Sequence, residues 1–313
     1  MNIRINLKKY LVHKNERNKG FMKHKFLVLG GDLRSIKLAE MLSDDDNKVY
    51  SYGLEESQDI IDNNSIEKVN SLKTGIEKAQ IIIAPVPFSS NGEYINTPFS
   101  KERIKIEELL KLNKNKILVG GAIKNEVKEK LNEKYLDVID VMEREELAIL
   151  NTIATAEGTI EVAINNTDKI LQGARVLILG FGRVAKIVAN KFSMLAANVT
   201  CSARKVSDLA WIKAYGYNAI NINDMIFDLK DFDIIINTVP QLIIEERELK
   251  HMNSEVLLID LASGAGGIDG KKAINMGLKY IWALSLPGKV APYSTAKFIK
   301  ETIYNVLEER NRK

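Results

Sequence analysis

The fold of the second half of this chain can be predicted from one stretch, Arg175-Val-Leu-Ile-Leu-Gly180-Phe-Gly182-Arg-Val-Ala185. Its apolar run breaks into Gly-x-Gly-x-x-Ala where a buried strand should turn into a helix. The first glycine permits a tight turn, the second lets backbone approach a pyrophosphate, and the small third residue lets the helix pack on the strand. The pattern is typical of a dinucleotide-binding turn, in which phosphates meet unpaired N–H groups at a helix N-terminus.

The flanking residues supply the β-α-β context that this motif requires. Apolar residues recur at helical spacing over residues 186–197, and a second apolar strand follows over residues 198–203. The alternative is that the glycines serve packing only. We expect the turn to contact the cofactor through Gly180, Phe181, Gly182, Arg183, Val184 and Ala185.

The end of the second strand favours one nicotinamide cofactor over the other. An NAD site usually has Asp or Glu about 20 residues beyond the glycines, where it binds the ribose 2′-hydroxyl. This chain has Ser202, Ala203, Arg204 and Lys205 there instead, a hydroxyl and two cations suited to a 2′-phosphate. These four residues predict NADP(H), and the alternative is a solvated basic loop.

Two later apolar runs, residues 232–240 and 255–263, read as parallel strands with polar carboxyl ends. Ligands bind at that edge of such sheets. The alternative is that the polar residues only end the strands and start turns. We expect the nicotinamide half of the site to be lined by Asn237, Thr238, Val239, Pro240, Asp260, Ala262 and Ser263.

The first half of the chain shows the same alternation of strands and helices. A strand over residues 25–29 runs into Gly30-Gly31-Asp32, which lacks the full dinucleotide spacing and serves the fold or a substrate contact. Further strands are expected over residues 48–52, 79–84 and 116–120, with a helix over residues 34–42. The predicted fold class is α/β, with two doubly wound, Rossmann-like parallel-sheet domains joined by a helix.

The predicted organisation has five parts. They are a flexible basic extension (1–21), a substrate-side α/β domain (22–142), an interdomain helix (143–170), an NADP-binding domain (171–290) and a C-terminal helix that returns to the first domain (291–313). Gly158 lies inside the interdomain helix, where it either breaks the helix or lets two helices approach closely.

Composition excludes several function classes. The formal net charge of the chain is +4, but the first 21 residues carry +5 and the rest carries −1, so a dedicated nucleic-acid surface is not expected on the body. No apolar run is expected to cross a membrane, and residues 1–21 are not expected to act as a secretory signal. The single Cys201 is expected to be inert packing, and the three scattered histidines predict no metal site.

With these parts placed, the chain resembles the family of dipicolinate synthase A subunits. Beyond the glycine turn, the resemblance is carried by segments from both halves, and it covers almost everything except residues 1–21, which look like an extension. Gly264-Ala-Gly-Gly267 departs from a proline-containing family segment. The segments are Leu29-Gly-Gly-Asp-Leu-Arg34, Met142-Glu-Arg-Glu-Glu-Leu-Ala-Ile149, Ala156-Glu-Gly-Thr-Ile160, Ser202-Ala-Arg204, Ile236-Asn-Thr-Val-Pro240, Asp260-Leu-Ala-Ser263 and Leu286-Pro-Gly-Lys-Val-Ala-Pro292.

The resemblance implies that a dihydrodipicolinate-type precursor from the lysine pathway loses hydride to NADP⁺ and a proton, giving aromatic dipicolinate. A planar dianion needs cations or helix N-termini at both ends. We expect it to be bound by Arg34, Arg144, Lys289, Ser294 and Thr295, with Lys289 as the leading candidate.

Proton transfer has no well-placed histidine, and the candidates are Glu157, Glu143, Asp260 and Tyr293. Glu157, beside Gly158, is the choice for the catalytic group together with Lys289, and the alternative for Glu157 is a helix-surface carboxylate. Aromatisation supplies driving force, so orientation and charge matching are the protein's main task.

The family further implies a partner, the flavoprotein B subunit, as well as a homo-oligomer and a cytoplasmic location in the mother cell of a sporulating bacterium. Two other functions stay open. The chain could be an NAD(P)-dependent amino-acid or 2-hydroxy-acid dehydrogenase, or it could bind NADP without catalysis and organise the flavoprotein.

Overall fold

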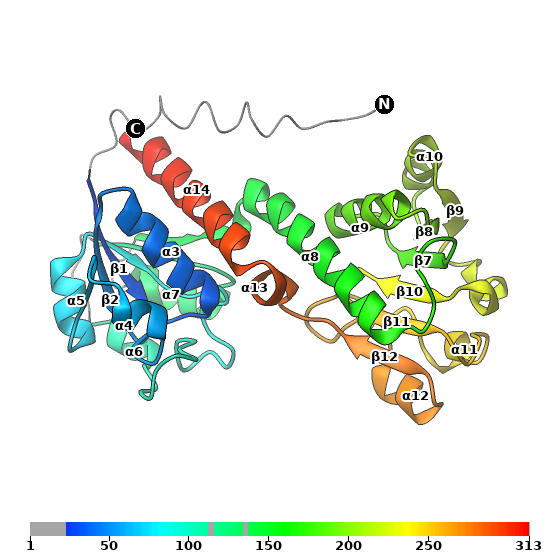
Figure 1. Ribbon diagram of the computed structural model, residues 1–313, viewed down its shortest axis with the longest axis horizontal. Coiled ribbons are helices and arrows are strands. Elements are labelled where there is room, and N and C mark those ends of the chain that lie inside the picture. The colour runs from blue at the N-terminus through cyan, green and yellow to red at the C-terminus, as the bar shows by residue number, and fades with distance from the viewer. Residues whose placement is uncertain (1–22, 112–115, 134–136, 313) are drawn as a thin grey trace. The chain divides into compact units, whose positions relative to one another are not determined.

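The computed structural model describes residues 23–111, 116–133 and 137–312, and the predicted extension, residues 1–21, lies outside them. The chain divides into two compact units between Val141 and Met142, and each is built on a six-stranded sheet (Figure 1). The predicted fold class, two doubly wound parallel-sheet domains, is confirmed.

Unit 1 contains the first six strands and their connecting helices. Its elements are β1 (Lys25–Leu29), α3 (Leu33–Asp44), β2 (Lys48–Tyr52), α4 (Gln58–Asp62), β3 (Ile66–Lys68), α5 (Leu72–Lys78), β4 (Ile81–Ile83), α6 (Ile106–Leu109), β5 (Ile117–Gly120), α7 (Asn125–Glu133) and β6 (Asp137–Asp140). The 3-10 helix η1 (Val141–Glu143) leads into unit 2.

Unit 2 begins with the longest helix and ends with another long one. Its elements are α8 (Glu145–Asn166), β7 (Arg175–Leu179), α9 (Arg183–Met194), β8 (Asn198–Ala203), α10 (Val206–Ala214), β9 (Asn218–Asn221), η2 (Met225–Phe227), η3 (Leu229–Asp231), β10 (Ile234–Asn237), α11 (Glu246–Leu249), β11 (Leu257–Asp260), α12 (Gly270–Asn275), β12 (Lys279–Trp282), α13 (Leu286–Val290) and α14 (Pro292–Asn311).

The two sheets share one topology. Unit 1 has the order β3-β2-β1-β4-β5-β6, and unit 2 has β9-β8-β7-β10-β11-β12 when its sheet is written from the β9 edge. Neighbouring strands are parallel throughout, so every strand ends at the same edge. The order reverses between β1 and β4 and between β7 and β10, and ligands bind at such switch points.

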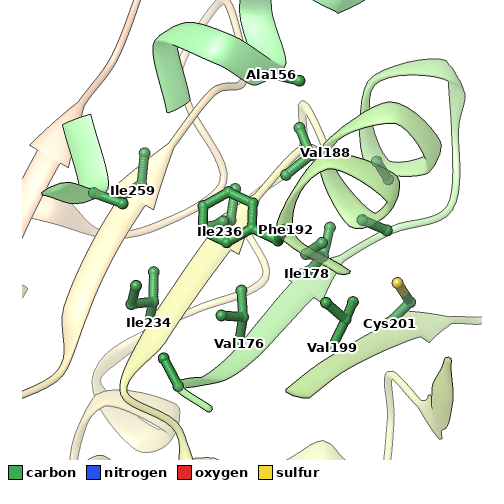
Figure 2. Close-up of a cluster of buried hydrophobic side chains, with 14 of the residues drawn as sticks. Ala156, Val176, Ile178, Val188, Phe192, Val199, Cys201, Ile234, Ile236 and Ile259 are labelled. Atoms are coloured by element: carbon green, nitrogen blue, oxygen red, sulfur yellow. The ribbon is translucent and has the colours of Figure 1, made fainter. Parts of the chain in front are cut away.

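Alternating side chains fill two cores in unit 2. Val176 and Ile178 of β7 point to one face, which α8 and α9 cover with residues such as Ala156 and Phe192 (Figure 2). Leu177 and Leu179 point to the other face, which is covered by α11, α12 and the 3-10 turns. Burying each large side chain contributes about 1.5–3 kcal/mol, so the strand ends rest on a rigid base.

Helix α8 runs unbroken through Gly158, so the close-approach interpretation is correct and the helix break is wrong. A Cβ at Gly158 would lie 3.0 Å from Leu286 Cβ of α13. By length and composition α8 could cross a membrane, contrary to the expectation that no run could. It packs instead on α9, α13, α14 and β11, as a core helix does.

The segment around Lys289 forms the short helix α13, with a proline in its first turn. Helix α14 follows directly and packs on α8 within unit 2. Its predicted return to the first domain stays a prediction.

Candidate functional site

The glycine turn after β7 leaves open space at the start of α9. Gly180 has φ +92°, and a Cβ there would lie 2.7 Å from Val239 Cγ2, so this position needs glycine. Gly182 is the N-cap of α9, no side chain caps the helix, and a Cβ at Gly182 would meet nothing within 4 Å. The first-turn N–H groups of α9 therefore face space that an anion can fill.

The other residues of the glycine motif differ in how far their side chains are buried. Ala185 is fully buried against the sheet, as the motif predicts for its small third residue. Phe181 also buries its side chain, beneath the Lys186 ammonium, which lies 5.4 Å from the ring centroid. Only the backbone of Phe181 is left for the predicted cofactor contact, whereas Arg183 is exposed and Val184 is half-buried.

The end of β8 lies beside the turn. The Gly180 N–H donates to the Ser202 carbonyl at 3.0 Å, which ties the two strand ends together. Ser202 and Ala203 are buried, and Ser202 Oγ has no hydrogen-bond partner within the described chain. Arg204 and Lys205 are exposed, and neither forms an ion pair with another residue of the described ranges. Two uncompensated cations therefore follow the strand where an NAD site would hold a carboxylate.

Asn237 and Asp260 join the ends of β10 and β11 in a buried network. Asp260 Oδ1 accepts from Asn237 Nδ2 at 2.7 Å and from Ala262 N at 3.0 Å. Asp260 Oδ2 accepts from Gly267 N at 2.7 Å and from Ile268 N at 3.1 Å. Both side chains are fully buried. They hold the two strand ends in place. Their side chains therefore fit the alternative, in which polar residues only end the strands and start turns, better than they fit contact with the cofactor.

This network also explains the glycine-rich segment that departs from the family pattern. Gly266 has φ +77°, and a Cβ there would lie 2.7 Å from Asp260 Oδ2. A Cβ at Gly267 would collide with Asn237 Nδ2. The loop can approach the buried carboxylate only because glycine stands at both positions.

The remaining residues of the predicted nicotinamide half line the same edge. Thr238 Oγ1 donates to the Leu179 carbonyl at 2.8 Å and so links β10 to β7. Val239 is half-buried and Ala262 is buried, while Pro240 and Ser263 are exposed. The structure thus brings the seven predicted positions together at the carboxyl ends of β10 and β11.

The matching turn of unit 1 is filled by the chain itself. A Cβ at Gly30, which has φ +58°, would collide with Thr97 Cγ2, and the Gly31 N–H donates to the Asn96 carbonyl at 2.9 Å. Asp32 caps α3 by accepting from Arg34 N at 3.0 Å. A carboxylate at the helix start repels phosphate, so this segment is better interpreted as a turn that serves the fold.

Arg34 is one of three predicted substrate residues that the structure gives partners within the chain. Its guanidinium is 9% exposed, lies 2.7 Å from Asp32 Oδ2 and also donates to the Val86 carbonyl. Its charge is balanced by Asp32, so it is not the free cation that a dianion would need.

Arg144 and Thr295 are the other two. Arg144 donates to both oxygens of Glu309, at 2.8 and 2.7 Å, and to Glu146, and these carboxylates raise the pKa of the guanidinium. Thr295 is fully buried and donates to the Pro287 carbonyl at 3.1 Å. Both residues fasten helices of unit 2 together.

Lys289 and Ser294 are exposed, and neither has an ion pair or hydrogen-bond partner among the residues described. Glu157 is 52% exposed, and Lys191 Nζ of α9 lies 2.9 Å from its Oε1. That ion pair favours the helix-surface alternative for Glu157.

Sequence reasoning missed Glu145, whose Oε2 lies 2.5 Å from Arg183 Nη1. It also missed Asn96 and Thr97, which fill the unit 1 turn. No spacing signal could have found these residues, because each reaches its partner only through the tertiary fold. Cys201 is buried as expected, and burial raises the pKa of its thiol to about 12, so it stays protonated.

Two family models match the chain, one in each unit. Residues 25–142 match the N-terminal domain of the dipicolinate synthase A subunit. Residues 152–275 match the NAD-binding domain of D-isomer specific 2-hydroxyacid dehydrogenases.

A full-length relative then decides the family. The chain is 30% identical over 289 residues to the dipicolinate synthase A subunit of Bacillus subtilis, covering 91% of this chain and 96% of the relative. The chain belongs to the family of dipicolinate synthase A subunits.

Solved structures of this family agree. The dipicolinate synthase A chain from Bacillus subtilis has a TM-score of 0.83 at 30% identity, covering 93% of this chain and 98% of that one. The dipicolinate synthase A subunit from Bacillus halodurans has a TM-score of 0.84 at 31% identity, covering 92% and 99%. The match to an NAD-binding dehydrogenase domain supports a nicotinamide cofactor and an oxidoreductase.

Proposed function

We propose that this chain is the NADP-dependent oxidoreductase subunit of a dipicolinate synthase. The observation that carries the proposal is the pairing of an uncapped glycine turn with two uncompensated cations, Arg204 and Lys205, after the next strand. The backbone N–H groups of α9 would hold the pyrophosphate, and the two cations would hold the 2′-phosphate.

Ser202 ends β8 directly beside Gly180, where the ribose of a dinucleotide would bind. Its hydroxyl is fully buried, so we expect the backbone of Ser202, and not its side chain, to contact the cofactor.

The proposed reaction oxidises a dihydrodipicolinate-type precursor. One ring C–H bond breaks and its electron pair leaves as hydride to NADP⁺, while the ring loses a second hydrogen as a proton, which gives dipicolinate and NADPH. NADP⁺ supplies the hydride acceptor when bound. The residues of this chain would orient the ring and match the charges of the two carboxylates.

Among the predicted substrate residues, Lys289 and Ser294 are available to a carboxylate because they are exposed and without a described partner. Glu157 would take the proton only by leaving its ion pair with Lys191. Substituting Glu157→Gln separates these roles: a proton acceptor loses kcat, whereas a surface carboxylate leaves kcat unchanged.

The deciding experiment compares the two cofactors in Arg204→Ala/Lys205→Ala. Losing two charge-assisted contacts should weaken NADP⁺ about 100-fold and NAD⁺ less than about threefold. Lys213→Ala, which removes an exposed cation from the last turn of α10, is the control. Equal loss of both cofactors would refute the choice of NADP(H).

The relatives are named as A subunits, which implies a partner subunit. We infer that this partner is the flavoprotein B subunit. We also infer that the two bind in the cytoplasm of the mother cell of a sporulating bacterium. A non-catalytic role remains a second candidate for that reason. Purified chain with NADP⁺ and precursor should form ultraviolet-absorbing dipicolinate alone, and formation only after the flavoprotein is added would assign catalysis to the complex.

A dehydrogenase of small acids is the other candidate, favoured by the 2-hydroxyacid dehydrogenase match over residues 152–275. Pyruvate- or glyoxylate-dependent oxidation of NAD(P)H tests it. Turnover with these acids and none with the dihydrodipicolinate precursor would replace the dipicolinate assignment.

A further inference from the structure

Arg183 is the first residue of α9, next to the uncapped glycine turn, and its guanidinium is already paired. Its Nη1 lies 2.5 Å from Glu145 Oε2, and the two side chains are 55% and 67% exposed. Neither side chain has another charged partner in the part of the chain that the structure describes. The pair therefore stands in solvent, where it can open easily.

Glu145 is held in this position by the packing of its helix. It is the first residue of α8, and α8 packs along α9. The neighbouring Glu146 is taken by Arg144, at 2.7 Å, which leaves Glu145 as the carboxylate that faces Arg183. The start of α9 is electropositive, so it attracts a carboxylate and a phosphate for the same reason.

We propose that Glu145 competes with the dinucleotide pyrophosphate for Arg183 and thereby weakens cofactor binding. This inference rests on the proposed cofactor site at the glycine turn. When the pyrophosphate binds, Arg183 exchanges one anion for another. Because a phosphate can accept two parallel hydrogen bonds from the guanidinium, the exchange favours the cofactor. The ion pair with Glu145 is lost in the exchange, and this loss reduces the net free energy of binding.

The same two helices carry a matched ion pair for comparison. Lys191 Nζ lies 2.9 Å from Glu157 Oε1, further along α9 and away from the glycine turn. Breaking it with Lys191→Met tests whether any lost ion pair between α8 and α9 alters cofactor binding.

The experiment is calorimetric titration of the full chain with NADP⁺ at several salt concentrations. Glu145→Gln should tighten binding about twofold to fivefold, the range that an exposed ion pair can supply. It should also steepen the salt dependence, because the variant forms a new ion pair on binding whereas the wild type exchanges one. A residue that only supports the fold would not change the salt dependence in this direction.

A double-mutant cycle with Arg183→Ala separates competition from the general effect of removing a negative charge. In the Arg183→Ala background, Glu145→Gln should change the affinity less than about 1.5-fold, and Lys191→Met should do the same in the wild type. Equal tightening with and without Arg183, or no tightening at all, overturns the competition while the cofactor site stands. A wild-type chain that takes up no NADP⁺ overturns the cofactor site and the competition with it.

Discussion

The turns after β1 and β7 occupy the same place in two sheets of identical strand order, yet they offer opposite surfaces to a ligand. After β1, the carboxylate of Asp32 caps α3, and Thr97 packs against Gly30. After β7, Gly182 leaves the start of α9 uncapped beside open space. The shared topology places a switch point in both units, and the capping residue and the loop that folds over it decide whether phosphate can enter.

The largest expected effect comes from giving the second turn the cap of the first. Gly182→Asp should preserve the fold, because Gly182 has an ordinary φ of −81° and space for a side chain, and Asp is a favourable N-cap. Its carboxylate would occupy the phosphate position and repel the pyrophosphate, so NADP⁺ affinity should fall more than about 100-fold. Calorimetry measures the affinity and circular dichroism checks the fold.

Gly182→Ala is the matched control for that substitution, since it adds a Cβ without charge into open space. It should lower the affinity for NADP⁺ less than about tenfold, because it only hinders the close approach of the backbone to the pyrophosphate. If Gly182→Asp bound NADP⁺ as well as Gly182→Ala does, charge at the helix start would not distinguish the two turns.

The next effect concerns the buried carboxylate that holds the nicotinamide side of unit 2. Asp260→Asn replaces an acceptor of four hydrogen bonds with an amide that must leave N–H groups unpaired, so it should destabilise the protein by about 3 kcal/mol. Asp269→Asn makes the same change at the half-buried N-cap of α12, which Asn also caps well, and should cost less than about 0.5 kcal/mol. Urea denaturation followed by circular dichroism compares them, and equal losses would contradict the network.

A smaller effect is expected at the first turn. Gly30→Ala introduces a Cβ at φ +58° and into contact with Thr97, so it should destabilise unit 1 by about 2 kcal/mol. Gly182→Ala should stay within about 0.5 kcal/mol, because its site is open. Thermal unfolding of both variants is the measurement. Similar midpoints would mean that the unit 1 turn is not filled.

These contrasts also show what the sequence could predict. The glycine turn, the cations after it and the strand ends follow from local patterns, since glycine spacing and apolar periodicity are written along the chain. Arg144 was expected to be free, but its partner Glu309 is 165 residues away. Thr97 likewise reaches Gly30 only after the β4–α6 connection has folded back. Whether a cation or a crevice is available depends on such distant partners, which no local pattern contains.

The smallest expected effect uses Cys201, buried in the α9 face of unit 2, as a reporter. Burial raises the pKa of the thiol from 9.0 to about 12, so the folded protein should react with a thiol reagent at pH 8 only through unfolding. Saturating NADP⁺ should slow labelling, because the ligand stabilises the unit that binds it. As the pH rises above about 9, the Cys201 thiol ionises in the unfolded chain but not in the folded one, so the free energy of unfolding falls. Fast labelling of folded protein at pH 8 would contradict the burial.

The most direct test is the stoichiometry of NADP⁺ binding to the intact chain by calorimetry. The open turn after β7 and the filled turn after β1 predict one NADP⁺ per chain, abolished by Gly182→Asp without loss of fold. Two NADP⁺ per chain, none, or uptake that survives Gly182→Asp would contradict the account.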